Sequence, residues 1–243
     1  CCRIVLPIFR LREYAIALKD TLHLLHRPCA SPRAVIALVH GLGEHIARYE
    51  HVARFFNEHH IALLGFDQRG HGRSPGKRGH APGLYALLDD IEDLLQQARE
   101  LHPDTPLFLY GHSMGGNLVL NYAARRRPQI SGFIATGAWI RLPENPPALL
   151  LLLARFMSVI WSTFSQPNGI DTQKLSRDPE IVQTYDEDPL VHDRISARLA
   201  TELLDAARWL NQFSGYLSAP ALIMHGSADQ VTDPAGSAAF AER

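Results

Sequence analysis

Ser113 lies between two glycines in Gly111-His112-Ser113-Met114-Gly115, which fits the pattern G-x-S-x-G. The apolar run "LFLY" before the pattern is typical of a buried strand, and "NLVLNYAARRRP" after it is typical of a helix. A sharp turn between strand and helix would expose the serine hydroxyl beside the partial positive charge of the helix N-terminus. The context therefore predicts a nucleophilic serine. The alternative interpretation is a glycine-rich turn capped by a serine.

Acyl transfer at a serine also needs backbone N–H groups aimed at the oxygen that becomes negative. We expect Met114, directly after the serine, to supply one N–H, and Leu42 in "HGLGEH" to supply the other. His40 and Gly41 would shape the loop that carries Leu42. The alternative for this loop is an ordinary connection between a strand and a helix.

A carboxylate that orients the catalytic base is expected after a later strand. The segment "ALIMHGSADQVTDP" offers Asp229 and Asp233. Asp229 is nearer the end of the strand and is our candidate, whereas Asp233 precedes a proline and is more typical of a turn or a helix start. The alternative role for Asp229 is the capping of a turn.

Five short apolar runs must position these residues, and none of them alternates between apolar and polar side chains. Such runs are typical of parallel strands buried on both faces. Each run ends in a polar residue or glycine, where a parallel sheet binds ligands. The expected strands are residues 34–40, 62–67, 107–113, 132–137 and 221–226.

Helical patterns separate the strands, most clearly at 84–101, where apolar residues recur with i, i+3, i+4, i+7 spacing. Alternating strands and helices predict an α/β fold with a mostly parallel sheet flanked by helices. Proline-rich residues 140–210 interrupt the alternation and predict a helical cap inserted into a core of residues 1–139 and 211–243. The apolar stretch 146–164 contains an arginine, so we interpret it as a cap or core helix rather than a membrane span. Residues 12–28 are interpreted as two edge strands.

Composition excludes several classes of protein. A net charge of -1 predicts no electrostatic attraction to nucleic acid. The three cysteines, Cys1, Cys2 and Cys29, form no disulfide framework or metal-binding spacing, so a reducing, cytoplasmic location is expected, with membrane association as a further expectation. No metal or cofactor is expected. "GKRG" lacks the serine or threonine of a phosphate-binding P-loop.

Several stretches, taken in order, resemble one branch of the α/β-hydrolase fold, the monoacylglycerol lipase and lysophospholipase-like serine hydrolases. The stretches are "VHGLGEHIARYEHVARFF", "GFDQRGHGRSPGKRGH", "LFLYGHSMGGNLVLNYA", "LSRDPEIVQTYDEDPLVHDRISARLATELL" and "PALIMHGSADQVTDP", within residues 34–234. The resemblance implies Ser113 as nucleophile, Asp229 as triad acid, and the Leu42 and Met114 N–H groups as oxyanion hole. It also implies that Glu44 and Arg48 lie near the polar alcohol end of a glyceride.

The catalytic base of the expected Ser-Asp-His triad has no candidate in this sequence. In this fold the histidine follows the aspartate, about 30 residues later in the family that the chain resembles. The last of the 13 histidines, His225, precedes Asp229, and only 14 residues follow Asp229. The chain also begins with Cys rather than Met. We interpret it as a fragment, inactive by itself, of a protein whose last strand, helix and histidine lie beyond residue 243.

The expected activity of the full-length protein is hydrolysis of a carboxylic ester, a monoglyceride or lysolipid, with transient lipid contact through the apolar cap. One alternative is a ligand-binding protein of the same fold without turnover, and another is an esterase or peptidase for a different substrate. Haloalkane dehalogenases and epoxide hydrolases are disfavoured because they have an aspartate where this chain has Ser113. The oligomeric state does not follow from the sequence.

Overall fold

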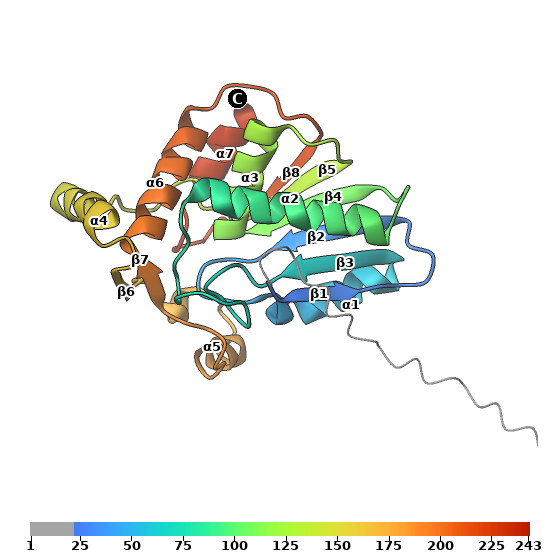
Figure 1. Cartoon of the computed structure of the whole chain (residues 1–243), viewed down its shortest axis with the longest axis horizontal. Coiled ribbons are helices and arrows are strands. Elements are labelled where there is room, and N and C mark those ends of the chain that lie inside the picture. The colour runs from blue at the N-terminus through green and yellow to red at the C-terminus, as the bar shows by residue number, and fades with distance from the viewer. Residues whose placement is uncertain (1–21) are drawn as a thin grey trace, which may run out of the picture.

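A six-stranded sheet forms the centre of the protein, whose computed structural model describes residues 22–243 (Figure 1). The strand order is β1-β3-β2-β4-β5-β8, and all neighbours are parallel except β1, which is antiparallel to β3. The expected α/β fold with a mostly parallel sheet is thereby confirmed, as are all five expected strands. The bounds are β1 Leu24–Arg27, β2 Ala34–Val39, β3 Ile61–Phe66, β4 Leu107–His112, β5 Gly132–Thr136 and β8 Ala221–Met224.

Both faces of the central strands are buried, because alternate side chains of β2 enter two different cores. Val35, Ala37 and Val39 join the larger core, which packs against helices on one face. Ile36 and Leu38 join a smaller core with η1 (Ile46–Tyr49) and α1 (Glu50–Glu58) on the opposite face. A strand packed on both sides needs no polar residues, which explains the continuous apolar run.

Four helices cover the face with the larger core: α2 (Leu84–Leu101), α3 (Met114–Arg126), α6 (Ala197–Gln212) and α7 (Pro234–Glu242). The predicted helix at 84–101 matches α2, whose buried side chains follow the expected spacing. Asp233 caps the N-terminus of α7, since its side chain accepts a hydrogen bond from the Ala235 N–H. The helix-start role expected for Asp233 is therefore confirmed.

The residues expected to form the cap lie beyond the carboxyl ends of β2 and β3, at the left of Figure 1. They include α4 (Ala148–Ile160), η2 (Thr172–Lys174) and α5 (Pro179–Asp186). Two short strands, β6 (Ser165–Pro167) and β7 (Arg194–Ser196), pair in a separate antiparallel sheet. Helix α6 begins inside the expected cap but packs with the core helices, so the boundary at residue 210 stays a prediction.

The expectation that all five parallel strands are buried on both faces is wrong for β8. Leu222 and Met224 are 54% and 45% exposed, and Ala221 is also exposed. Within residues 22–243 β8 pairs only with β5, and the cluster that contains α1 covers the β1-β3-β2 side of the sheet. The apolar run of β8 therefore predicts a strand but not its surroundings.

Two further expectations concern the N-terminal segment 12–28 and the longest apolar stretch, 146–164. The second of the two edge strands expected at 12–28 corresponds to β1, while the first lies outside the described residues. Helix α4 accounts for most of the apolar stretch 146–164 and is 13 residues long. Among residues 22–243, no helix combines the length and apolar character that crossing a membrane requires.

Candidate active site

Ser113 occupies the single residue between β4 and α3, with φ of 54° and ψ of -114°. This backbone conformation is rare for residues other than glycine, and the surrounding structure must hold it in place. The Ser113 N–H donates to the carbonyl of Thr136 on β5, and its carbonyl accepts from the N–H groups of Asn117 and Trp139. The backbone is thus fixed from three sides, while the Ser113 hydroxyl makes no hydrogen bond within residues 22–243.

The turn requires glycine because backbone segments pass close to it. A Cβ atom on Gly115 would collide with the carbonyl oxygens of Val39 and His40 at the end of β2. A Cβ atom on Gly111 would collide with the carbonyl of Gly115 itself. The two glycines of the G-x-S-x-G pattern therefore let the first turn of α3 sit directly against the sheet.

The loop after β2 lies against this turn. A Cβ atom on Gly41 would be 3.3 Å from Cβ of Ser113, so the loop and the serine are in contact. The N–H groups of Leu42 and Met114 have no acceptor among the described residues. Met114 is the first residue of α3, where backbone N–H groups have no partner within the helix. Both proposed oxyanion donors are therefore available beside Ser113.

His40 is fully buried and holds the loop rather than facing the serine. Its Nδ1 is 2.8 Å from the carbonyl oxygen of Gly41, and its Nε2 accepts from the N–H of Gln68 at 2.9 Å. These partners assign a neutral ring with the proton on Nδ1. Burial lowers the pKa of His40, which keeps the ring neutral.

Asp229 lies in the loop after β8, and its carboxylate is already hydrogen-bonded. Oδ1 accepts from the N–H groups of Val231 and Thr232 at 2.8 and 2.9 Å, and Oδ2 accepts from the Thr232 hydroxyl at 3.0 Å. Burial alone would raise the pKa of Asp229, but these hydrogen bonds and the nearby His225 outweigh it and lower the pKa. The carboxylate is therefore ionised at neutral pH and fixed in orientation.

Two histidines lie near Asp229 and Ser113, and both have other partners. His225 Nε2 is 3.2 Å from Asp229 Oδ2, while its Nδ1 is 2.7 Å from the Ser237 hydroxyl. His112 Nδ1 is 2.9 Å from the Thr136 hydroxyl. Among the residues that the structure describes, no histidine hydrogen-bonds to the Ser113 hydroxyl. The sequence-based expectation that neither of these residues replaces the base agrees with this geometry.

Glu44 and Arg48 lie next to the loop that carries Leu42. Glu44 Oε1 accepts from the Gly41 N–H at 2.6 Å and from the Tyr49 hydroxyl at 2.8 Å, and Arg48 Nε is 3.7 Å from Glu44 Oε2. Arg48 also covers the ring of Tyr185 in the cap. Neither residue is among those lining the cavities at Ser113, so their contact with an alcohol group stays a prediction.

Ser113 and Asp229 line two adjoining cavities of about 600 and 650 Å³. The first extends past Leu42 and Trp139 to Ile195 in the cap, and the second extends past His112 to the segment 173–177. A space this size, at the carboxyl edge of the sheet and under a cap, is typical of small-molecule sites.

Sequence reasoning did not single out several residues that line these cavities. Trp139 lies three residues after the end of β5, and Thr232 lies three residues after Asp229. Their positions shortly after strand ends were the only feature of the sequence that could have indicated a place in the site. Lys174 and Ile195 come from the cap, where the sequence pattern carried no signal for side-chain direction.

The "DQRGHGRSPG" loop, expected to be structural, is held by its own contacts. Asp67 accepts from the N–H groups of Ile46 and Arg73, and Arg69 forms an ion pair with Asp90 of α2. Within residues 22–243, no group of three or more His, Cys, Asp or Glu side chains is arranged to hold a metal ion.

Known proteins resemble this chain in sequence and in fold. The chain is 35% identical to a monoacylglycerol lipase of Mycolicibacterium smegmatis over 89% of its own length and 77% of that protein. It is 36% identical to an abhydrolase domain-containing protein of Dictyostelium discoideum, covering 93% of this chain but only 24% of that protein. The crystal structure of a monoacylglycerol lipase from Paleococcus ferrophilus superposes with a TM-score of 0.83 at 35% identity, covering 91% of this chain and 83% of that one.

The family described as "Serine aminopeptidase, S33" matches residues 30–243, which include both the turn at Ser113 and the loop at Asp229. The match therefore spans the five parallel strands of the sheet, the residues expected to form the cap, and the candidate site. The chain belongs to this family of α/β-hydrolases and, within it, is similar to monoacylglycerol lipases.

Proposed function

We propose that the full-length protein is a serine hydrolase that cleaves a carboxylic ester, with a monoacylglycerol or a lysolipid as its substrate. The observation that carries this proposal is the strained backbone of Ser113, whose free hydroxyl lines the same cavity as the ionised Asp229. Strain at an isolated serine with no hydrogen bond to its hydroxyl has no evident structural benefit, so a nucleophilic role accounts for it.

In this mechanism the Ser113 hydroxyl attacks the ester carbonyl carbon while a histidine takes its proton. The N–H groups of Leu42 and Met114 stabilise the oxyanion of the tetrahedral intermediate. The histidine then donates the proton to the leaving alcohol, and an acyl-serine forms. Water, activated by the same histidine, attacks the acyl-serine and releases the fatty acid.

We propose that this histidine lies beyond residue 243 and is oriented by Asp229. One support is that the Asp229 carboxylate lines both cavities at Ser113, so it is accessible from the space that the base would occupy. A second support is the chain order of the fold, in which the histidine follows the aspartate. The hydrolytic activity of residues 1–243 alone is accordingly expected to be very low.

An acyl chain is the favoured occupant of the cap side of the site. Ile195 lines both the cavity at Ser113 and an apolar cavity of about 130 Å³ beneath α4, whose other walls include Leu153, Met157 and Phe164. The names of the relatives support the same substrate class, since several are monoacylglycerol or monoglyceride lipases. A monoglyceride lipase of Saccharomyces cerevisiae, 25% identical, has been crystallised with a substrate analogue.

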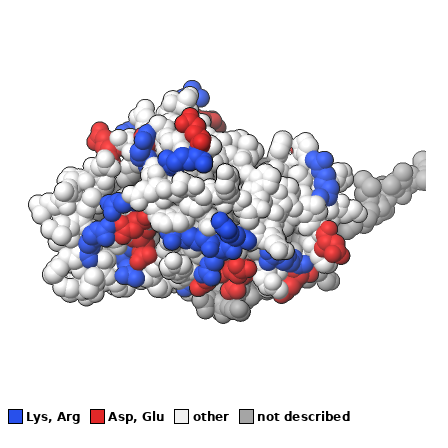
Figure 2. All heavy atoms as spheres, turned by 90° about the horizontal axis from the view of Figure 1, so that it is seen from above, with Lys and Arg blue, Asp and Glu red and all other residues white. Residues whose placement is uncertain are grey.

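We also propose that the cap makes transient contact with lipid through α4. Its exposed side chains are almost all apolar, and Figure 2 shows mainly uncharged atoms at the left-hand end, where α4 lies in Figure 1. An exposed apolar patch of this kind is typical of a surface that meets a membrane or another apolar partner. The residues concerned are Leu149, Leu150, Leu152, Leu153, Phe156, Val159 and Ile160 of α4, together with Trp161 directly after it.

The test is covalent labelling of the full-length protein with a fluorophosphonate, together with hydrolysis of a monoacylglycerol and of a p-nitrophenyl ester. We expect labelling at Ser113, turnover of both esters, and loss of both signals in Ser113→Ala. Removing the residues after 243 should lower turnover by a large factor, on the order of a million-fold if only the base is lost. Unchanged turnover in Ser113→Ala would contradict the proposal. Binding of the monoacylglycerol without labelling or turnover would instead favour the non-catalytic ligand-binding alternative.

A further inference from the structure

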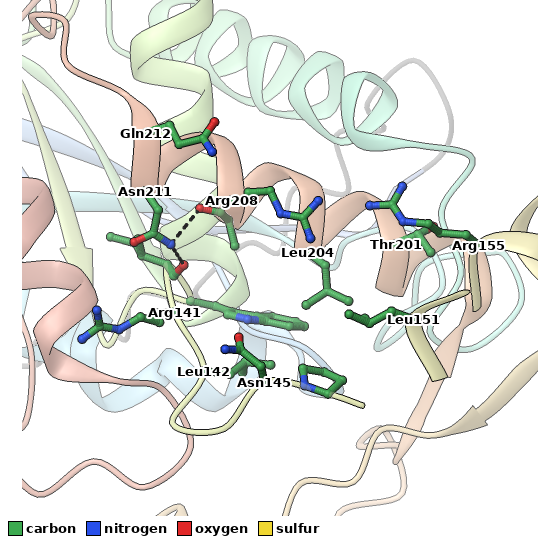
Figure 3. A pocket seen from close by; sticks show the side chains of 14 residues that line it. Arg141, Leu142, Asn145, Leu151, Arg155, Thr201, Leu204, Arg208, Asn211 and Gln212 are labelled. Carbon is green, nitrogen blue, oxygen red and sulfur yellow. Dashed lines mark hydrogen bonds between the residues drawn. The ribbon is translucent and has the colours of Figure 1, made fainter. Parts of the chain in front are cut away.

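A separate cavity lies behind the candidate active site, between α4, α6 and the segment 139–146 (Figure 3). Its volume is about 220 Å³. Trp139 and Leu142 line both this cavity and the 600 Å³ cavity at Ser113, so the two spaces share a wall. Ser113 and Asp229 do not line it, and the ester chemistry proposed above does not use it.

The charged residues that line this separate cavity are all cationic, and its uncharged polar residues are Asn145, Thr201, Asn211 and Gln212. Arg141, Arg155 and Arg208 are the charged residues in its wall, and no acidic side chain lines it. Arg141 pairs with Asp233, and Figure 3 shows its guanidinium group directed away from Arg208. Arg155 and Arg208 instead direct their guanidinium groups toward each other on one side of the cavity.

These two guanidinium groups share one carboxylate. Asp205 Oδ1 is 2.5 Å from Arg155 Nη2 and 3.5 Å from Arg208 Nη1. Two positive charges and one negative charge leave a net positive charge at the edge of the cavity. Arginine's planar set of donors suits a carboxylate, and the longer contact to Arg208 leaves donors available.

The remaining wall is mostly apolar. Leu142, Leu151 and Leu204 lie opposite or beside the two guanidinium groups, and the Trp139 ring completes the wall. Asn211 is already engaged, since its amide nitrogen donates to the carbonyls of Ile140 and Ala207. A ligand that fits this lining needs a single negative group at one end and a short apolar body.

We propose that this cavity binds an amphiphilic monocarboxylate, with its carboxylate between Arg155 and Arg208 and its alkyl chain against Trp139, Leu142 and Leu204. The site is defined without reference to the hydrolysis proposed above. Its ligand class matches the acid that such a hydrolysis would release, and the shared wall at Trp139 would place that acid one side chain away from where it forms.

Binding of sodium octanoate to the full chain, measured by titration calorimetry, tests the proposal independently of any ester turnover. Saturable binding at one site is expected, accompanied by a change in tryptophan fluorescence that is absent in Trp139→Phe. Arg155→Gln and Arg208→Gln should each weaken binding about tenfold, because each removes a charge-assisted hydrogen bond to the carboxylate. Asp205→Asn should strengthen binding, because it removes the competing carboxylate.

Three controls locate the ligand. Arg126→Gln breaks a comparable exposed ion pair with Asp89 and should leave octanoate binding unchanged. Lys174→Gln removes a cation that lines both cavities at Ser113 and should also leave it unchanged. Octan-1-ol, which lacks the charge, should bind more weakly and equally to the native protein and Arg208→Gln.

The proposal is overturned if octanoate does not bind, if Arg155→Gln and Arg208→Gln bind it as tightly as the native protein, or if Lys174→Gln is the variant that loses binding. Arg155 and Arg208 are about half exposed, so neither substitution is expected to unfold the chain. If melting shows that Arg208→Gln is unfolded, Arg208→Lys serves as the second variant. Lysine keeps the charge of Arg208 but not its planar set of donors. The proposal would also be overturned if Arg208→Lys and Arg155→Gln both bound octanoate with native affinity.

Discussion

At the scale of single residues, the candidate site depends on a few positions whose backbone conformation or close contacts are unfavourable for most residue types. Ser113 has the clearest cost, because its φ of 54° is a conformation that glycine adopts freely and serine does not. Gly111 and Gly115 have no room for a side chain. A Cβ atom on Gly115 would meet the end of β2, and one on Gly111 would meet the first turn of α3. The sequence pattern predicted this turn because the spacing of glycines around a serine reflects these steric limits.

The first prediction is that Ser113→Gly unfolds at a higher temperature than Ser113→Ala. Neither variant has the hydroxyl, so the comparison isolates the backbone. Glycine relieves the strain, whereas alanine keeps a Cβ atom at positive φ, and we expect a difference of about 1 kcal/mol in the free energy of unfolding. Thermal or urea unfolding of both variants measures it. Equal stability would mean that the turn at Ser113 is not strained.

The second prediction concerns Glu44, which the resemblance placed near the substrate alcohol and the structure places against the Gly41 N–H. Glu44→Ala should loosen the loop that carries Leu42 and cost about 1–2 kcal/mol, because the buried N–H loses its acceptor. Glu44→Gln keeps an acceptor oxygen and should restore most of the loss. Hydrogen exchange of the Gly41 and Leu42 amides measures the effect directly. Native protection in Glu44→Ala would show that Glu44 does not hold the loop.

No sequence pattern identified a catalytic base for Ser113 among the described residues. Spacing and the positions of strand ends predicted that Ser113, Leu42 and Asp229 would lie together, and all three line one cavity. Met114 follows Ser113 directly, as the first residue of α3. Sequence reasoning also left His225 out of the base role, and its partners Ser237, Thr232 and Asp229 agree with that. Trp139 was missed because an apolar residue in a loop has no pattern that distinguishes a cavity wall from a core.

At the scale of elements, apolar runs predicted strands well and their environment less well. The runs of β2 and β3 are continuous because cores lie on both faces. The run of β8 looks the same, yet its side chains are largely exposed in residues 22–243. The burial of a strand depends on which other elements pack on its faces, and the sequence of the strand itself does not indicate this.

Helix α4 is the element whose surface least resembles that of a water-exposed helix. Val159 and Leu152 are 80% and 65% exposed, whereas Ser158 is the buried residue of α4. Arg155, at the border between the two sides, pairs with Asp205 of α6. The helix thus has a fixed inner side and an apolar outer side. A lipid surface would remove that outer side from water at a gain of roughly 25 cal/mol for each Å² buried.

The third prediction is that Leu152→Glu with Val159→Glu weakens binding to phosphatidylcholine vesicles, since each charge must be taken out of water. We expect at least a tenfold loss in vesicle co-sedimentation, with melting temperature nearly unchanged because both side chains are exposed. Tyr216→Glu is the matched control, because Tyr216 is 88% exposed outside α4. An equal loss in Tyr216→Glu, or no loss in the double variant, would contradict a specific contact through α4.

At the scale of the whole molecule, the cap is joined to the core by buried polar contacts that no sequence pattern indicated. The backbone N–H of His192 donates to the carbonyl of Gly43, in the loop that carries Leu42. The centroids of the His192 and His71 rings are 4.6 Å apart. His45 Nε2 is 2.7 Å from Asp188 of the cap. These contacts join residues about 120 to 150 positions apart, which explains why local periodicity could not reveal them.

The rings of His71 and His192 are both neutral, and each has its proton on a different nitrogen. His71 Nδ1 lies 3.1 Å from the carbonyl of Arg69, which assigns a proton to Nδ1 and leaves Nε2 as an acceptor. His192 Nδ1 accepts from the Arg194 N–H, which assigns its proton to Nε2. Nε2 of His71 is an acceptor and Nε2 of His192 carries a proton. Both atoms are buried and have no hydrogen-bond partner among the described residues. A second proton on either ring would place a charge in this largely buried contact between cap and core.

The fourth prediction is that the protein becomes less stable as the pH falls from 7.5 to 5. Burial, reinforced by Arg78, lowers the pKa of His192 to about 4, and burial together with His40 and His192 lowers the pKa of His71 well below its ordinary value. Between about pH 6.5 and pH 4 the unfolded chain therefore binds protons that the folded chain does not, so stability is complete above the unfolded pKa and is lost as the pH falls. For His192, which is partly exposed, we expect a loss of about 1 kcal/mol at pH 5 after allowance for solvent screening.

Melting temperatures of the native chain and His192→Gln, measured at pH 7.5 and pH 5, separate this contact from other acid effects. His192→Gln cannot gain the proton, so its melting temperature should fall less between the two pH values. His26, whose pKa burial lowers to about 4 beside His102, lies on β1 away from the cap and contributes in both proteins. His51→Gln, on the exposed surface of α1, is the matched control and should keep the full native pH dependence. The same pH dependence in native protein and His192→Gln would show that the cap and core are not joined through a neutral histidine pair, and that the acid sensitivity of the fold arises elsewhere.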